Sequence, residues 1–249
     1  MTNIGKKAAG SFAKILSPAL DLLFPARCPL CGCVLTGKEQ YVCAGCRETL
    51  PFITDPYCLR CGRPIRDETK EYCPQCEKGS SLFDEGRCTF RYEGALRDAL
   101  LDMKFKNKRE YIPFFAVAMA ERNRVYLQRN QFDMIIPVPL HPRKKAERGF
   151  DQCALIGREL AEQTGIPLRC DILKRVRYTN PQKTLNARER SINLEGAFAV
   201  NEGTLPPGAG VLLIDDILTT GATLSECSRV LKKGGAGKVG FLALSAPEI

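Results

Sequence analysis

The sequence predicts an α/β protein, in which a mostly parallel sheet is flanked by helices and preceded by a small cysteine-rich module. From residue 83 onward, apolar runs of strand length alternate with helical patterns, an order typical of parallel sheets covered by helices. Before that point, residues 28–76 hold eight cysteines in four C-x-x-C units. The composition, 44% hydrophobic and 26% charged over 249 residues, excludes disordered, collagenous and coiled-coil classes. We therefore expect a folded chain of one or two domains.

Residues 1–26 are predicted to form a separate N-terminal amphipathic helix. The apolar stretch from Ala8 to Phe24 is interrupted by Lys14, Pro18 and Asp21. A membrane span needs roughly 18 or more uncharged residues, and the apolar region of a signal peptide is also free of such interruptions. We therefore expect no membrane span and a cytoplasmic protein.

Residues 27–82 are predicted to form a double zinc ribbon. Two C-x-x-C turns can complete a tetrahedral site of four sulfurs, the geometry of structural zinc. Glycine and then an apolar residue follow the units at Cys31 and Cys61 but not those at Cys46 and Cys76, so the repeat is 30 residues long. We predict two zinc ions, with Cys28, Cys31, Cys43 and Cys46 in one site and Cys58, Cys61, Cys73 and Cys76 in the other. A disulfide framework or a redox dithiol fits this regular spacing less well.

The other cysteines occur in unrelated contexts and are predicted to be small buried hydrophobic residues. They are Cys33, Cys88, Cys153, Cys170 and Cys227. Cys33 is the exception to this prediction, because it lies close enough to the first site to compete as a ligand.

Residues 83–249 are predicted to form the α/β domain, and each element follows from its local pattern. Apolar runs bounded by turn residues indicate strands, one of which ends in proline, and the 3.6-residue apolar period indicates helices. The strands are expected at 87–92, 132–138, 171–175, 197–200, 210–214 and 238–244, and the helices at 94–105, 111–128, 152–164 and 222–233. Ligands of such folds bind at the carboxyl ends of the strands.

The segment 211–223 carries the clearest chemical signal. Four apolar residues precede Asp215 and Asp216, and a loop from Thr219 to Thr223 then leads into a helix. Hydroxyls and free amides at a helix N-terminus suit a phosphate, while adjacent carboxylates suit vicinal hydroxyls or Mg²⁺. Together they describe a site for ribose 5-phosphate. A solvated turn with a threonine cap is the alternative, but it leaves the repulsion between two neighbouring carboxylates unexplained.

This segment resembles the signature of type I phosphoribosyltransferases, which bind phosphoribosyl diphosphate (PRPP). Residues 137–143 and 147–152 resemble the ComF family in particular, as do residues 91–106 and 175–198, so the resemblance covers nearly the whole chain. That family joins a zinc ribbon module to a phosphoribosyltransferase domain and is linked with DNA uptake in competent bacteria. One departure is Asp151, where the family usually has asparagine.

The resemblance implies roles for individual residues. Asp215 and Asp216 would hold the ribose hydroxyls, and Arg148 would stabilise the departing pyrophosphate; these three form the expected catalytic set. The residues expected to bind PRPP, with Mg²⁺, are Asp215, Asp216, Thr219, Thr220, Gly221, Ala222, Thr223 and Arg143. His141, between two prolines, is at least as well explained as a turn residue as a general base. The long basic stretch 175–191 is predicted to act as a lid over PRPP.

Two functions from different classes remain open at this stage. The first is an enzyme in which an acceptor nitrogen attacks C1 of PRPP and releases pyrophosphate; the sequence does not reveal the acceptor. The second is a non-catalytic module that handles single-stranded DNA or binds DNA-uptake proteins, with a vestigial or ligand-sensing PRPP site. The net charge of +9 fits a polyanionic partner. A grip on DNA would be formed by Lys104, Phe105, Lys106, Lys108 and Arg109, although a solvated helix face and loop explains the same run equally well.

Overall fold

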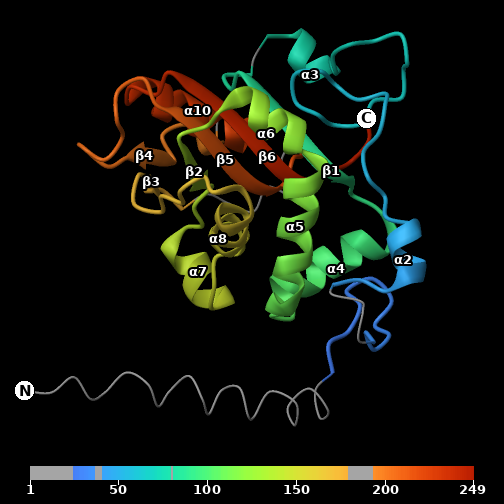
Figure 1. Ribbon diagram of the computed structural model, residues 1–249. Coiled ribbons are helices and arrows are strands. Elements are labelled where there is room, and N and C mark those ends of the chain that lie inside the picture. The colour runs from blue at the N-terminus through green and yellow to red at the C-terminus, as the bar shows by residue number, and fades with distance from the viewer. Residues whose placement is uncertain (1–24, 37–40, 80, 179–192) are drawn as a thin grey trace, which may run out of the picture. The chain divides into compact units, whose positions relative to one another are not determined.

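The computed structural model describes residues 25–36, 41–79, 81–178 and 193–249 (Figure 1). The predicted helix over residues 1–26 and most of the predicted lid therefore lie outside the described residues. Backbone contacts divide the chain into two compact units, Met1–Thr49 and Leu50–Ile249, and each is described by itself. None of the helices in the described ranges is long and apolar enough to cross a membrane.

The first unit contains the first cysteine site. A tight turn after Cys28 is closed by the Gly32 amide, which donates to the Cys28 carbonyl at 2.9 Å, and Gly32 adopts a φ of 74° that suits glycine. The second cysteine pair of this site flanks the start of helix α2 (Ala44–Glu48), for which Cys43 is the N-cap. The turn and the helix together bring four thiols within reach of one another.

The second unit opens with the same turn, displaced by 30 residues. The Gly62 amide donates to the Cys58 carbonyl at 2.8 Å, and the isolated bridge between Arg27 and Val34 recurs between Tyr57 and Pro64. Helix α3 (Pro74–Glu77) carries the second cysteine pair of this site. The structure thus confirms the internal repeat that the glycine positions predict.

The main sheet contains four parallel strands in the order β1-β6-β5-β2. They are β1 (Glu85–Arg91), β2 (Met134–Pro137), β5 (Gly210–Ile217) and β6 (Lys238–Ala246). Because all four run in one direction, their carboxyl ends share one edge, where the predicted site should lie. The expected parallel sheet of the α/β domain is thus present.

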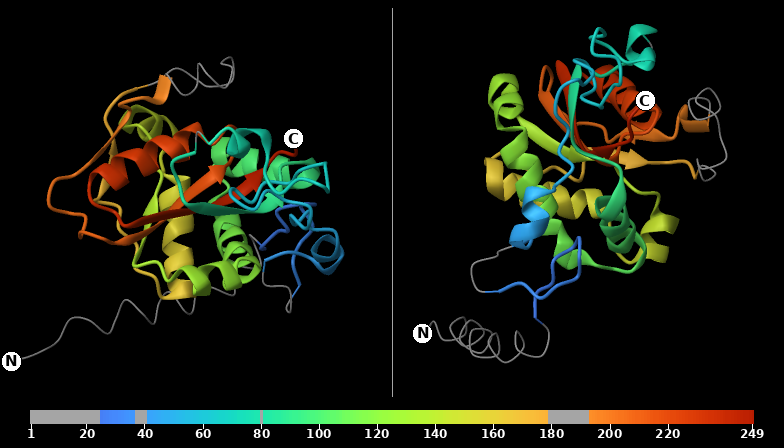
Figure 2. Two further views of the ribbon diagram at one scale, coloured as in Figure 1. Left: turned by 90° about the horizontal axis from the view of Figure 1, so that it is seen from above. Right: turned by 90° about the vertical axis from the view of Figure 1, so that its right-hand side faces the viewer.

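Helices cover both faces of this sheet (Figures 1 and 2). Helices α5 (Ile112–Arg122) and α8 (Gln152–Thr164) pack together and against the strands on one face. On the other face, Val211 and Leu213 of β5 join a buried cluster with helix α10 (Ala222–Lys233). All four cysteines of the second site belong to the same cluster, so this ribbon is part of the core of the α/β unit.

Three elements differ from the sequence-based prediction. The helix expected at 111–128 is divided into a short 3-10 turn, η1 (Arg109–Tyr111), then α5, then α6 (Arg124–Asn130). The break falls at Asn123, whose buried amide donates to the Met119 carbonyl at 2.9 Å and to the Thr89 hydroxyl at 3.1 Å. An asparagine that bonds the backbone in this way competes with continued helix.

The other two differences concern the edges of the site. The strands β3 (Leu173–Arg175) and β4 (Phe198–Val200) pair antiparallel in a small sheet of their own and do not join the main sheet. Residues Pro142–Arg148, for which no regular element is expected between the strand at 132–138 and the helix at 152–164, form helix α7. Helix α4 (Gly94–Phe105) lies where the periodicity predicts it.

Candidate functional site

The two neighbouring carboxylates lie at the carboxyl end of β5, on the edge shared by the parallel strands. β5 is longer than predicted and includes both residues, and Asp215 aligns with Ala243 of β6. The Asp216 amide donates to Oδ1 of Asp215 at 2.9 Å. The pair is therefore held on rigid strand backbone and does not form a free turn.

Asp216 is the centre of a buried polar network. Lys104 at the end of α4 places its Nζ 2.8 Å from Oδ2 of Asp216, and the two side chains are only 11% and 13% exposed. Gln152, the first residue of α8, donates to the same carboxylate at 2.6 Å. Arg148 at the end of α7 donates in turn to the Gln152 side-chain oxygen at 2.5 Å. Two helices, α4 and α8, thus supply groups to one carboxylate, and α7 supplies the arginine that holds one of those groups.

This network gives the two neighbouring carboxyl groups different pKa values. Burial and the neighbouring Asp216 charge raise the pKa of Asp215 to about 7. Burial acts in the same direction on Asp216, but the Lys104 charge and the hydrogen bonds from Lys104 and Gln152 outweigh it, so the pKa of Asp216 is lowered. One carboxylate is held ionised and the other titrates near neutral pH, a pattern typical of functional sites.

The predicted phosphate loop follows directly after β5. The Leu218 amide donates to the Ser245 carbonyl at 2.9 Å, which ties the start of the loop to β6. Gly221 has a φ of 78° and is the N-cap of α10, and the Thr220 hydroxyl accepts from the Ala222 amide at 3.4 Å. Because the cap residue has no side chain, the first turn of α10 presents its amides at the loop, as an anion site requires.

The basic segment after β2 is ordered by its own capping contact. His141 is the N-cap of α7, and its Nδ1 accepts from the Arg143 amide at 3.2 Å. Arg143 forms an exposed ion pair with Glu147 at 3.2 Å, whereas Arg148 lies inward on Gln152. Burial, followed by the charges of Arg175 and Arg148, lowers the pKa of Lys144, so positive charge is concentrated here.

Asp151, where the ComF family usually has asparagine, has a structural role. Its carboxylate accepts from the Ala154 amide at 3.1 Å as the N-cap of α8 and from the Leu140 amide at 3.3 Å. The two contacts use the two different carboxylate oxygens, whereas asparagine has a single acceptor oxygen beside its NH2 donor. The residue therefore joins the loop after β2 to α8 and needs no donor function.

Sequence reasoning missed three residues that contact the site. The sequence pattern includes Gln152 only within the motif at 147–152. It assigns Lys104 to the predicted DNA grip and assigns no role to Arg63. Arg63 is 2% exposed and its guanidinium donates to the Thr219 backbone carbonyl. For Gln152, the available signal was its position at the start of a helix whose N-cap lies next to the basic segment.

One residue of the predicted DNA grip lies inside the site, and the others have partners within the described part of the chain. Lys104 points into the site, while Lys106 pairs with Asp102 at 2.9 Å and Lys108 with Glu110 at 3.2 Å. Arg109 lies over the Phe150 ring at 4.8 Å. Phe105 is 66% exposed, although the Arg148 guanidinium lies 5.5 Å from its ring centre.

The eight C-x-x-C cysteines gather into the two groups predicted from the repeat. Within each group the sulfurs all lie within 4.8 Å of one another, and four soft thiolates at that separation fit Zn²⁺. All four cysteines of the second group are buried, whereas the first group contains the exposed Cys31. The two groups therefore differ in how strongly a bound metal would be shielded from water.

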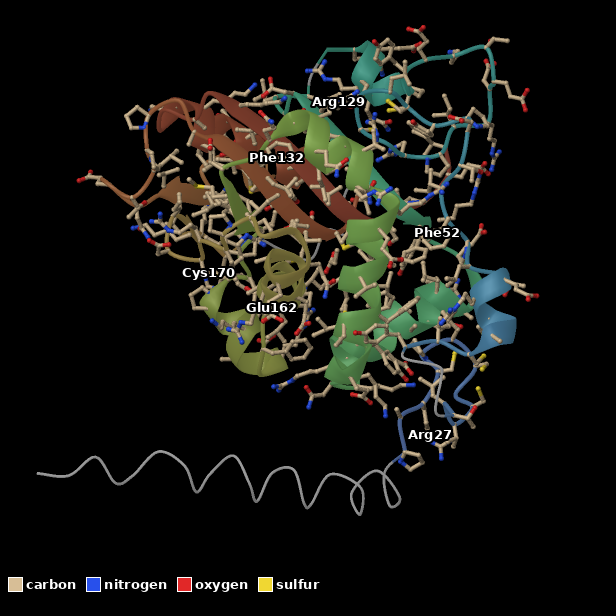
Figure 3. All side chains as sticks on the ribbon, in the orientation of Figure 1. Arg27, Phe52, Arg129, Phe132, Glu162 and Cys170 are labelled. Atoms are coloured by element: carbon tan, nitrogen blue, oxygen red, sulfur yellow. The ribbon has the colours of Figure 1, made fainter. Side chains whose placement is uncertain are left out.

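The remaining cysteines divide by burial. Cys88, Cys153 and Cys227 are buried as predicted, but Cys33 and Cys170 are exposed, and Cys170 lies just before β3 (Figure 3). The prediction of burial is wrong for Cys170, which lies in a loop outside the sheet, and it does not extend to Cys33, the expected competitor at the first site. Cys153 lies 4.0 Å from Asp215, and burial raises the pKa of its thiol well above the usual value. A neutral thiol is a poor ligand for Mg²⁺, which prefers oxygen.

Comparison with known proteins finds a family match for the cysteine-rich module and another for the α/β domain. Residues 19–77 match the family described as Double zinc ribbon domain, and residues 151–247 match Phosphoribosyl transferase domain. The chain is therefore a protein of the phosphoribosyltransferase fold that carries a double zinc ribbon.

Relatives of similar length define the family more narrowly. Competence protein F of Haemophilus influenzae is 31% identical over 222 residues, which cover 87% of this chain and 95% of the relative. Competence protein ComFC of Bacillus subtilis is 27% identical over 249 residues, covering 97% and 99%. DNA utilization protein YhgH of Escherichia coli is 29% identical over 218 residues, covering 80% and 93%. The chain belongs to the ComF family.

Proposed function

We propose that this protein binds PRPP with Mg²⁺ and transfers its phosphoribosyl group to an acceptor. The observation that carries the proposal is the position of Asp215 and Asp216 on the last residues of β5, directly before the Thr219–Thr223 loop and the start of α10. Carboxylates there would accept hydrogen bonds from the ribose hydroxyls while the loop amides and hydroxyls bind the 5-phosphate. A ribose 5-phosphate carries both of these groups, its hydroxyls for the carboxylates and its phosphate for the loop.

The reaction would be a substitution at C1 of the ribose. An acceptor nitrogen forms a bond to C1, the bond from C1 to the pyrophosphate oxygen breaks, and the proton on the nitrogen passes to solvent or a base. Arg148 is the residue we assign to the leaving pyrophosphate, with Arg143 as a second cation at the start of the same helix. Their charges would stabilise the departing group more strongly in the transition state than in the ground state.

The carboxylate oxygens of Asp215 and Asp216 fit Mg²⁺ better than the neutral thiol beside them. When bound with PRPP, Mg²⁺ would neutralise part of the pyrophosphate charge. Lys104 now pairs with Asp216, so ribose hydroxyls would share this carboxylate with the ammonium group or displace it.

The test is calorimetric titration of PRPP, with Mg²⁺ present, into wild type and two threonine variants. Thr220→Ala should weaken binding by about tenfold, because a hydrogen bond to an ionised partner is worth ~1.5–3 kcal/mol and the helix-end amides remain. Thr164→Ala is the matched control, since its hydroxyl bonds the Leu160 carbonyl at the far end of α8. Unchanged affinity of Thr220→Ala would count against the assigned loop. Pyrophosphate release over a panel of nitrogen bases would then identify the acceptor.

A second candidate is a non-catalytic protein that handles single-stranded DNA in the cytoplasm, alone or with DNA-uptake proteins. It is favoured by the relatives named for competence and DNA utilization and by the net charge of +9. Binding of this kind should be insensitive to sequence and should fall steeply as salt rises, because it depends on counterion release. A strong preference for one duplex sequence at physiological salt would contradict it. PRPP binding without pyrophosphate release would favour this candidate over the enzyme.

A further inference from the structure

Arg63 is a buried cation that connects the second cysteine site to the phosphate loop. It follows Cys61 and Gly62 in the turn of the second ribbon and is 2% exposed. Its terminal nitrogen donates to the backbone carbonyl of Thr219, the first residue of the predicted 5-phosphate loop. Within the second unit, the ribbon therefore touches the site that we assign to PRPP.

The first ribbon shows that a cysteine site of this type does not itself require the arginine. Cys33 occupies the equivalent position, 30 residues earlier, and its carbonyl accepts from the Cys28 amide at 2.8 Å just as the Arg63 carbonyl accepts from the Cys58 amide at 2.8 Å. The backbone role is the same in both ribbons. Only the side chain differs, so the arginine side chain acts on a part of the protein outside the turn.

The turn that carries Arg63 is fixed rigidly against the sheet. Gly62 has a φ of 69°, and a Cβ added to it would meet the Cα of Arg87 in β1 at 2.6 Å. The neighbouring Cys61 carbonyl accepts from the Cys88 thiol at 3.4 Å, and the Gly86 amide donates to the Arg60 carbonyl at 2.8 Å. Backbone contact this close leaves the turn little freedom to move away from β1.

The charge of Arg63 has no acidic partner in the described part of the chain. No carboxylate there forms an ion pair with it, and its Nε has no hydrogen-bond partner. A buried cation is costly unless a negative charge compensates it. Two sources of such charge fit its position: the thiolates of a metal-loaded second site beside it, and a phosphate bound at the loop whose carbonyl it holds.

The bond to Thr219 also sets the direction of the next amide. In a trans peptide the carbonyl and the N–H point in opposite directions. With the Thr219 carbonyl held toward Arg63, the Thr220 N–H points away from the ribbon, on the side of the loop that remains for a ligand.

We propose that Arg63 is a positioning residue through which the second cysteine site holds the Thr219–Thr223 loop in its phosphate-binding conformation. This proposal rests on the proposed function, because it assigns the 5-phosphate to that loop. Metal in the second site, but not in the first, is then needed for tight binding of any ligand that carries this phosphate. The ligand class is a sugar 5-phosphate, and the pyrophosphate end of PRPP lies outside the effect.

The experiment compares Arg63→Met and Arg63→Lys with Arg60→Met as the matched control. Arg60 lies in the same ribbon and also donates to backbone carbonyls, but to those of Ser81 and Phe83. Arg63→Met should weaken binding of both PRPP and ribose 5-phosphate by roughly 10- to 100-fold, the loss expected for a charge-assisted hydrogen bond. Binding of pyrophosphate alone should not change, the zinc content should stay at the wild-type level, and Arg63→Lys should recover part of the loss. Equal weakening of pyrophosphate binding, or an effect of Arg60→Met as large, would overturn the proposal.

A second measurement needs neither ligand nor the methionine variant. Amide hydrogen exchange of residues 219–223 is followed in ligand-free protein as a chelator removes zinc, with circular dichroism to show that the sheet persists. Exchange in the loop should accelerate when the second site loses metal, and should be unaffected in a Cys31→Ser variant, which damages only the first site. Unchanged loop exchange after loss of metal from the second site would refute the coupling. Wild type that binds neither PRPP nor ribose 5-phosphate would refute the proposed function, while the exchange result would still decide the coupling.

Discussion

The pKa values of the acidic pair predict how PRPP affinity depends on pH. Asp215 titrates near pH 7 because it is buried beside Asp216, and its ionised form is the better acceptor for ribose hydroxyls and for Mg²⁺. With a pKa of about 7, roughly one tenth of the protein carries an ionised Asp215 at pH 6 and roughly nine tenths at pH 8. Affinity should therefore rise about tenfold between these two pH values.

Replacing Lys104 tests whether Asp215 causes this pH dependence. Its charge lowers the pKa of both carboxyls, so Lys104→Met should move the midpoint of the affinity profile to higher pH. Lys106→Met is the matched control, because Lys106 lies two residues further on and pairs with Asp102 at the surface. Removing that charge should leave the midpoint where it is.

The assay is calorimetric titration of PRPP with Mg²⁺ from pH 5.5 to 8.5 at constant ionic strength. The ligand phosphates also titrate near pH 6, but they contribute equally to all three proteins, so the comparison between variants isolates the protein. The reasoning is refuted if Lys104→Met and wild type have the same midpoint, or if Lys106→Met shifts it as far.

Two further predictions concern metal content and stability. Elemental analysis should find two zinc ions per chain, one for each cysteine group, and a value of one or none would contradict the double zinc ribbon. Asp215→Asn should melt at a higher temperature than wild type, and its advantage should grow between pH 5 and pH 8. The sign follows because the folded state raises this pKa above its usual 3.8, so ionisation costs folding free energy as pH rises. An advantage of about 1 kcal/mol would correspond to roughly 2–4 °C, and an advantage that shrinks with pH would refute the sign.

We choose the single substitution because the two carboxylates are not equivalent. Asp216 pairs with Lys104, whose side chain is only 11% exposed, so replacing Asp216 by asparagine would leave a buried ammonium without its counter-charge. The loss of stability would then obscure any loss of binding. For Asp215, burial and the neighbouring Asp216 charge oppose ionisation, so replacing it relieves repulsion.

Local patterns predict the regular elements well. Helices at 94–105, 152–164 and 222–233 have the predicted bounds, because the apolar periodicity of each is continuous over its length. At the second of these, Asp151 caps the first turn and Gly165 adopts the left-handed conformation that ends the helix. Local signals fail where a long-range contact decides, as at Asn123, whose amide reaches Thr89 of β1.

The same distinction explains which parts of the candidate site could be predicted. The carboxylates and the loop after them form one continuous segment, so their chemistry is visible in the sequence. The role of Lys104 cannot be predicted in this way, because a run of cations shows how much charge is present but not where each side chain points. The helix ends at Phe105, so Lys104 projects from its last turn toward the sheet, while Lys106 is its C-cap and pairs with Asp102.

The role of Arg63 is harder to predict, because no sequence pattern around it distinguishes it from any other arginine in a turn. Its importance follows from the packing of Gly62 against β1, which brings a residue of the ribbon to a loop far away in the sequence. The residues that sequence reasoning overlooked are thus the ones that join separate elements at the site. They control the ionisation of one carboxylate and the orientation of one carbonyl, and both depend on tertiary packing that short motifs do not record.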